Sequence, residues 1–132
     1  MPNKILTTHG WQERVRNKLG VDENYLPNAI IEQPEHINIA EEYAISHVPN
    51  YDSIDDDARI WLEAAVVAKC ASIICPILKV IVPVREQGPH FTRDLTYNWD
   101  RRKKELEDEC DMHLSVYMDS PGGPKGFRVH NG

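Results

Sequence analysis

Apolar residues recur every three or four positions along much of this chain, a spacing that places their side chains on one face of an α-helix. The first such set is Trp11, Val15 and Leu19. We therefore predict a short helix over residues 10–19. Thr8 is a candidate for its N-terminal cap, and Gly20 is suited to end it.

A second amphipathic helix is predicted over residues 35–47, where Pro49 prevents its continuation. Its buried stripe should consist of four apolar residues: Ile37, Ala40, Ala44 and Val48. Glu41 and Glu42 lie between these positions in the sequence, and we expect both carboxylates to face water.

The third predicted helix, over residues 58–77, differs from the first two because its apolar residues reach nearly all sides. Residues 53–56 have the sequence Ser-Ile-Asp-Asp, which we interpret as a capping box. Asp55, Asp56 and Asp57 add negative charge where the helix dipole favours it. Such a helix must be covered on most faces. It is therefore either the central helix of a small bundle or a helix covered in part by a neighbouring subunit.

The rest of the chain is predicted to hold one more helix between two extended segments. Pro76 and Pro83 bracket the exit from the third helix into an extended connector loop. A fourth helix follows over residues 94–117, with a partial apolar stripe and a dense run of charges. Residues 119–132 contain two prolines and four glycines, so we expect a flexible, extended C-terminal arm.

These elements define the expected fold. It is all-α, a small bundle of about four helices over residues 1–118 followed by the arm over residues 119–132. A chain of 132 residues is long enough for one domain with its own core and too short for two domains of ordinary size.

The charge of the chain limits the partners that suit it. Fifteen Lys and Arg residues against twenty-one Asp and Glu residues give a net charge of −6. Residues 21–66 contain eleven acidic residues and a single basic one, Arg59. This balance argues against a protein that grips nucleic-acid phosphates, because such binding depends on a basic surface.

The cysteines and the apolar stretches indicate where the protein resides. Cys70, Cys75 and Cys110 are an odd number of thiols, which implies no disulfide framework and fits a reducing compartment. The N-terminal residues lack the apolar core of a signal peptide. The longest apolar stretch, residues 64–78, contains a lysine and a serine and falls short of a membrane-spanning helix. We expect a soluble intracellular protein without membrane association.

The sequence contains no catalytic motif. Glu32 and His36, and likewise Glu109 and His113, are spaced to share a helix face, but His-Glu-x-x-His and Cys-x-x-Cys are absent. Gly-x-Ser-x-Gly, Ser-x-x-Lys and the phosphate-binding glycine loop are absent as well. We therefore predict no enzyme activity, no metal and no cofactor. A small metal-dependent enzyme is kept as an alternative.

A cluster of four basic residues, 101–104, lies in the fourth predicted helix. Acidic residues follow immediately, so the two signs should form ion pairs four residues apart, such as Arg101 with Glu105 and Lys104 with Asp108. We interpret this ladder as a solvated or intersubunit face rather than a DNA contact. The intersubunit candidates are Arg101, Arg102, Lys104, Glu105 and Asp108.

The order of these features resembles a known family. An acid-rich turn leads into an Ala-rich apolar helix ending at a proline, in residues 39–78, and a loop and a long charged helix follow in residues 86–114. Residues 19–31, LGVDENYLPNAII, add to the resemblance. The chain is similar to the head–tail connector proteins of tailed bacteriophages, also called adaptor or head-completion proteins. The resemblance covers residues 11–114 and rests on this pattern rather than on a catalytic signature.

The resemblance implies a structural virion protein. In that family, helical bundles form a homo-oligomeric ring, commonly of twelve subunits, beneath the portal protein. The ring extends the DNA channel and receives the next neck or tail-completion protein. DNA would pass through without sequence-specific binding, at the head–tail interface of a virion assembled in the host cytoplasm. An acidic lining suits such a conduit because it repels phosphate.

The resemblance also implies roles for particular residues. The C-terminal arm would grasp the portal, with these candidates: Pro121, Gly122, Gly123, Phe127 and Val129. Acidic candidates for the channel surface, chosen by composition alone, are Glu41, Glu42, Asp55, Asp56 and Asp57. A small helical regulatory or antitoxin-like protein is the other alternative, although a basic recognition helix would be expected in it.

Overall fold

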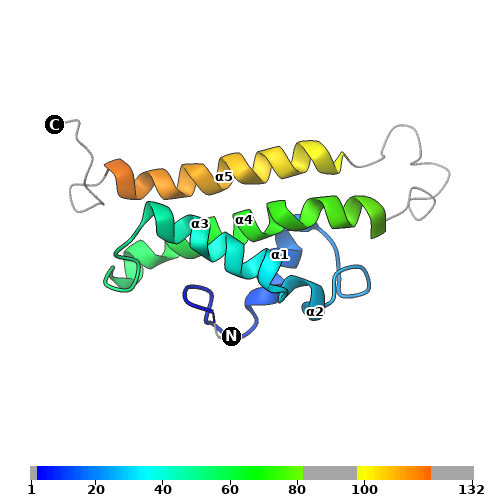
Figure 1. Ribbon diagram of the computed structural model, residues 1–132, viewed down its shortest axis with the longest axis horizontal. Helices are drawn as coiled ribbons and strands as arrows, with labels where there is room; N and C mark the ends of the chain where they lie inside the picture. Colours follow the sequence, from blue (N-terminus) through cyan, green and yellow to red (C-terminus); the bar gives the residue numbers. More distant parts are fainter. Residues whose placement is uncertain (1–2, 82–97, 120–132) are drawn as a thin grey trace.

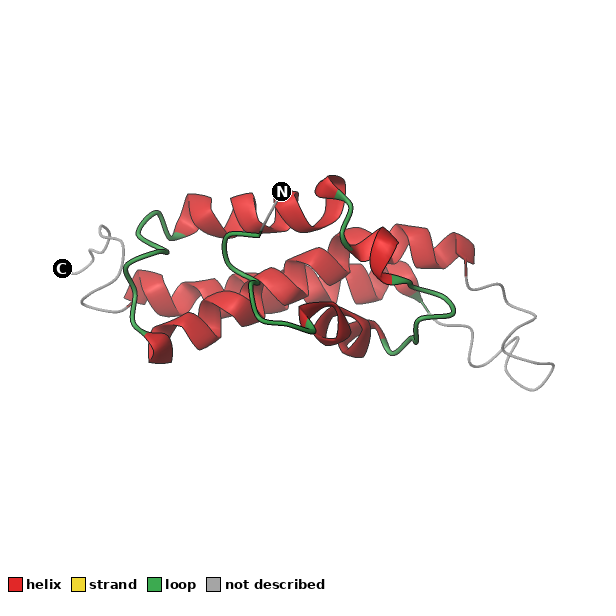
Figure 2. Cartoon of the chain, turned by 90° about the horizontal axis from the view of Figure 1, so that it is seen from below, coloured by secondary structure: helices red, strands yellow, loops and turns green. Residues whose placement is uncertain are grey.

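Two long antiparallel helices form the frame of the molecule in the computed structural model, which describes residues 3–81 and 98–119 (Figure 1). The helices in chain order are α1 (Trp11–Leu19), α2 (Asn28–Ile31), the π-helix η1 (Pro34–Asn38), α3 (Ile39–His47), α4 (Asp56–Ile81) and α5 (Trp99–Asp119). The described residues contain helices and loops only (Figure 2). The predicted all-α class is confirmed, and the short helix α2 is an addition to the predicted elements.

Helix α4 is the centre of the bundle, because α1, α3, η1 and α5 all pack against it. Its fully buried residues occur on several faces and include Leu62, Val66, Cys70, Ile74 and Leu78. The sequence left open whether a bundle or a neighbouring subunit covers this helix. The bundle covers most of it, although some of its large apolar residues remain exposed, as described below.

The N-terminus of α4 is capped differently from the prediction. The Asp55 carboxylate accepts a hydrogen bond from the backbone N–H of Ala58 at 2.8 Å. Ser53, the predicted capping residue, instead donates its hydroxyl to the Asn50 carbonyl at 3.0 Å. The helix starts two residues later than a Ser53 cap would require, so Asp55 stands at the capping position. The predicted capping box is wrong, and the Asp55 carboxylate alone caps the helix.

The predicted end of this helix at residue 77 is also wrong, because α4 contains Pro76 and continues beyond residue 77 to Ile81. The proline has no N–H to donate within the helix, at a typical cost of about 3 kcal/mol. Ile74 and Leu78, on either side of it, are fully buried, and this packing holds the helix together. Residues 79–81, predicted as extended, form its last turn.

Helix α4 is therefore longer than the apolar stretch considered in the sequence. By length and composition alone it would suffice to cross a bilayer, a test that core helices of soluble proteins also pass. Of its apolar 18-residue window, 56% is buried inside the bundle. The prediction that this segment is too short to span a membrane is thus wrong on length.

The two N-terminal helices agree with the apolar pattern. Trp11, Val15 and Leu19 are buried on α1, and Gly20 ends that helix with a φ of 70°. Thr8 does not cap it, because Gly10, with a φ of 84°, occupies the capping position. The predicted second helix is present as η1 followed by α3. All four residues of its predicted stripe are buried: Ile37, Ala40, Ala44 and Val48.

Helix α5 begins at Trp99 and ends at Asp119, one residue into the range predicted as the arm. Its buried residues are Trp99, Leu106, Cys110, Leu114 and Tyr117, and they pack against α4. The predicted start of this helix at residues 94–97 and the rest of the connector loop lie outside the described residues. So do the portal-binding candidates of the arm.

Candidate interaction surfaces

A buried carboxylate on α3 holds the N-terminal strap, which we define as residues 3–7. The strap is bound through the backbone N–H groups of Lys4 (3.0 Å), Ile5 (2.8 Å) and Leu6 (2.9 Å), which all donate to Glu41. The Glu41 side chain accepts these three bonds with both oxygens while only 1% of the residue is exposed. The prediction that Glu41 faces water, and with it the channel, is wrong. Backbone amides from a segment 35 or more residues away replace its water.

The strap is fixed from α4 as well. Arg59 donates a hydrogen bond from Nη2 to the Ile5 carbonyl at 2.6 Å. Ile5 and Leu6 are completely buried, so the strap contributes to the core. At its outer edge, Lys4 forms an ion pair with Glu42 at 3.1 Å, and both side chains are at least half exposed. The strap therefore joins the start of the chain to α3 and α4.

The other acidic candidates are on the surface. Glu42 is exposed on α3, and Asp55, Asp56 and Asp57 are exposed where α4 begins. The three aspartates lie at one end of the bundle. Four of the five acidic candidates thus stay available to a partner or a channel, although they belong to two separate places on the fold.

The charged ladder on α5 is present as predicted. Arg101 pairs with Glu105 at 3.9 Å and Lys104 pairs with Asp108 at 2.8 Å, with all four side chains more than half exposed. Arg102 has a different position, because its Nη2 donates to the carbonyl of Lys18 at 2.9 Å. Its guanidinium links α5 to the end of α1 within one chain. The exposed members of the predicted set are therefore Arg101, Lys104, Glu105 and Asp108.

A second link between α1 and α5 involves a carboxylate that the sequence suggested as a metal ligand. Glu109 accepts a hydrogen bond from the ammonium of Lys18 and lies 3.2 Å from Nε2 of His113. Burial would raise the pKa of Glu109, but the hydrogen bonds from Lys18 and His113 together outweigh it, and the pKa is lowered. The carboxylate is thus used as an ionised bridge between two helices.

The other proposed metal pair is divided between different partners. Glu32 accepts a hydrogen bond from Gln12 at 2.6 Å, while Nδ1 of His36 lies 2.5 Å from the Ile30 carbonyl. Within residues 3–81 and 98–119, no three His, Cys, Asp or Glu side chains form a group that could hold a metal ion. The positions of His36 and His113 are explained by their contacts inside the fold.

The three cysteines are free and buried. Burial raises the pKa of Cys70 and of Cys110 to about 12, and that of Cys75 to about 11. A thiol reacts as its thiolate, so these shifts oppose nucleophilic chemistry. The three cysteines therefore behave as small apolar residues of the core.

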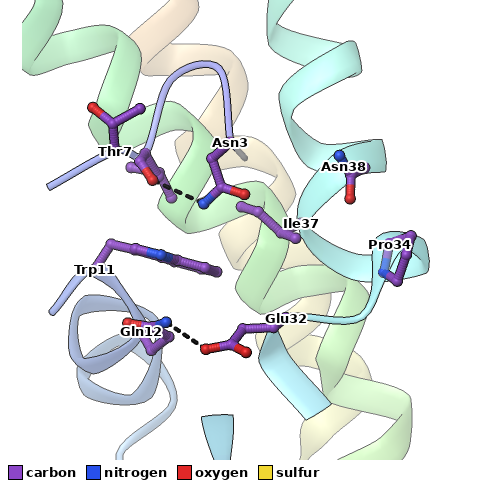
Figure 3. Close-up of a pocket in the computed structure, with 9 residues that line it drawn as sticks. Asn3, Thr7, Trp11, Gln12, Glu32, Pro34, Ile37 and Asn38 are labelled. Carbon is purple, nitrogen blue, oxygen red and sulfur yellow. Dashed lines mark hydrogen bonds between the residues drawn. The ribbon is translucent and has the colours of Figure 1, made fainter. Parts of the chain in front are cut away.

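A pocket of about 560 Å³ lies between the strap, α1 and η1 (Figure 3). Its lining residues include Leu6, Trp11 and Ile37 on the apolar side and Asn3, Thr7, Gln12, Glu32 and Asn38 on the polar side. The hydrogen bond from Gln12 to Glu32 crosses one edge of it (Figure 3). The pocket is broadly open to solvent, and it presents amide and carboxylate groups without a paired nucleophile and base. Its chemistry is that of a hydrogen-bonding surface.

Large apolar side chains remain exposed near the two ends of the α4–α5 pair. The surface residues of this kind on these helices are Ile60 (62%), Trp61 (44%), Val80 (81%), Met112 (61%) and Val116 (38%). The centroid of the Trp61 ring lies 5.7 Å from that of His113, which places Trp61 beside the C-terminal part of α5. The all-round apolar pattern of α4 predicted residues of this kind without identifying them.

Comparisons with known proteins give no family for this chain. A scan against protein-family models, a search of curated proteins and a search of solved structures each found no match.

Proposed function

We propose that this protein is a head–tail connector of a tailed bacteriophage or a related prophage. In this proposal, copies of the chain form a ring beneath the portal protein, extend the DNA channel and receive the next neck or tail protein. The order of sequence features that resembles this family is the starting point. It spans α1, α3, α4 and most of α5, the helices that make up the bundle.

One observation carries the proposal. The helix at the centre of the bundle keeps Trp61 and Val80 at the surface, 44% and 81% exposed. Exposing large apolar side chains to water costs free energy, and such side chains are common where two protein surfaces meet. A subunit of a ring has two neighbours, and it therefore needs contact surfaces at two places. Trp61 and Val80 are 19 positions apart on one continuous helix, which amounts to about 28 Å at 1.5 Å per residue.

The exposed acids fit the same proposal. Glu42 and the aspartates 55–57 carry negative charge on the surface of a chain with a net charge of −6. A conduit for DNA benefits from a surface that repels phosphate, because attraction would slow its passage. In this proposal these side chains contribute to the channel or its rim.

The test is attachment to heads. Capsids that carry the cognate portal but lack neck proteins are incubated with the purified chain, sedimented and quantified for bound protein and retained DNA. We expect several copies bound per capsid, twelve being the common number in the family, together with higher DNA retention. A chain truncated after residue 119, which lacks the predicted arm, serves as the matched comparison and should bind weakly. Full-length protein that neither attaches nor improves DNA retention would overturn the proposal.

A further inference from the structure

The pocket between the strap, α1 and η1 combines a flat aromatic surface with polar groups. The ring of Trp11 extends into it between Asn3 on one side and Glu32 on the other (Figure 3). Leu6 and Ile37 add apolar surface. The volume of about 560 Å³ falls in the range of about 300–1,000 Å³ that is usual for small-ligand sites. Because the pocket is open to solvent, a side chain that is still attached to a protein backbone can enter it.

The amide side chains of this pocket use their nitrogens within the fold. Nδ2 of Asn3 donates a hydrogen bond to the Leu6 carbonyl at 2.8 Å, and Nε2 of Gln12 donates to Oε2 of Glu32 at 2.6 Å. Within the described part of the chain, neither Oδ1 of Asn3 nor Oε1 of Gln12 accepts a hydrogen bond. The pocket therefore offers acceptors to a ligand, and it favours a ligand with several donors.

The charge of the pocket comes from Glu32, the one charged side chain among the described residues that line it. Its carboxylate accepts the hydrogen bond from Gln12. In residues 3–81 and 98–119, no lysine or arginine forms an ion pair with Glu32. A negative charge without a basic partner, beside further acceptor oxygens, selects for a cation with N–H donors.

We infer that this pocket binds the guanidinium group of an arginine side chain. Guanidinium has five N–H donors for the acceptor oxygens, and it is planar and stacks on aromatic rings. Its place is against the ring of Trp11 with its donors toward Glu32, and its carbon stem lies along the apolar surface. The ammonium of a lysine has no flat face to place on the ring, so lysine binds more weakly. The charge of Glu32 repels phosphates and carboxylates.

The arginine has two possible sources. One is another protein, and the other is the C-terminal segment of this chain, in which Arg128 lies outside the described residues. Both sources present the same group, and the experiment below separates them. The site is a property of the isolated chain, so this inference is independent of the proposed function and is tested without heads or portal.

Nuclear magnetic resonance of the isotope-labelled, full-length protein provides the measurement. The probe is N-acetyl-arginine-N-methylamide, an arginine side chain without charged ends. We expect a Kd on the order of 1–10 mM. The indole N–H signal of Trp11 should shift, whereas those of Trp61 and Trp99, which lie outside the pocket, should not. The citrulline derivative is the matched probe, because its neutral urea has the same shape. It should bind at least about fivefold more weakly.

Two variants separate the charge of the pocket from the charge of its surroundings. Glu32→Gln removes the carboxylate and keeps an oxygen that accepts from Gln12, and the exposed position should leave the melting temperature unchanged. Glu35→Gln is the matched control, because Glu35 is exposed three positions along and does not line the pocket. We expect Glu32→Gln to weaken binding about five- to tenfold and Glu35→Gln less than about twofold.

The full-length Arg128→Gln variant identifies the source of the arginine. If Arg128 fills the pocket of its own chain, the variant lacks this competitor and should bind the added probe more tightly than the wild type. Equal affinities of the variant and the wild type assign the pocket to an arginine of another protein.

Three results would overturn the inference. The first is an unshifted Trp11 signal in both the wild type and Arg128→Gln at about 50 mM probe, well above the expected Kd. The second is equal affinity for the arginine and citrulline derivatives. The third is an equal loss of affinity in Glu32→Gln and Glu35→Gln.

Discussion

Replacing Glu41 by glutamine removes one charge from the interior and changes almost nothing in volume. Glu41 is the only group that accepts hydrogen bonds from the N–H groups of residues 4–6 among the bonds found in the described residues. A glutamine side chain has one acceptor oxygen, and its NH₂ group donates. In the glutamine variant, the NH₂ group replaces one carboxylate oxygen and faces a backbone N–H of the strap. Two donors then stand opposite each other, and no hydrogen bond forms between them.

The size of the effect follows from this geometry. Oε2 of Glu41 accepts the N–H groups of Ile5 and Leu6, and Oε1 accepts that of Lys4. If the glutamine oxygen takes the place of Oε2, it still accepts from Ile5 and Leu6, but as a neutral acceptor. The hydrogen bond from Lys4 is lost. A hydrogen bond to a charged group contributes about 1.5–3 kcal/mol and a neutral one about 0.5–1.5 kcal/mol. We expect Glu41→Gln to lower the free energy of unfolding by about 2–4 kcal/mol. The loss is no larger because a strap that detaches can form hydrogen bonds with water.

Glu42→Gln is the matched control at the adjacent position. Glu42 is exposed and pairs with an exposed lysine, so its loss should cost less than about 0.5 kcal/mol. Urea unfolding followed by circular dichroism compares the two variants. Hydrogen exchange should also accelerate at least about tenfold for the amides of residues 4–6 in Glu41→Gln, and little in Glu42→Gln. Equal stabilities of the two variants, with unchanged exchange in the strap, would refute the buried role of Glu41.

Three further predictions follow from the same structure. The three cysteine thiols should react with a maleimide at pH 7 only as fast as the protein unfolds, because they are buried with raised pKa values, and rapid labelling of the native protein would contradict this. Glu109 has a lowered pKa, so its contribution to stability is present above its ordinary pKa of 4.5 and is lost as the pH falls through the lower value of the folded state. Unfolding free energies measured between about pH 6 and pH 3 should therefore fall less steeply in Glu109→Gln than in the parent, and identical slopes would refute the assignment. Removal of residues 120–132 should leave helical content and melting temperature nearly unchanged, as expected for a segment rich in glycine and proline, and a large loss of either would show that these residues belong to the core.

The sequence predicted those parts of the fold that depend on local periodicity. The stripe of Trp11, Val15 and Leu19 is buried, and so is the stripe that starts at Ile37. In both helices the apolar residues recur at the helical period, and a single buried face satisfies them. The ion pairs of α5 were predictable for the same reason, since residues four positions apart on a helix are neighbours whatever surrounds them.

The remaining features depend on contacts between distant parts of the chain. Glu41 has the composition and spacing of a surface residue, and only the arrival of the strap makes it an interior one. Pro76 normally ends a helix, but the core on both sides of it keeps α4 continuous. Arg102 belongs to a basic cluster in the sequence, and its position beside the carbonyl of Lys18 depends on how α1 crosses the bundle. Periodicity contains no information on these partners.

The central claim is that many copies of this chain form a ring at the portal of a phage head. Electron microscopy of neck particles from portal-bearing heads, with the stoichiometry counted by native mass spectrometry, tests it most directly. The account predicts a closed ring of identical helical subunits under the portal, in which the α4–α5 pair of each copy contacts its neighbour and DNA occupies the centre. Particles that carry a single copy of the chain, or none, would contradict it.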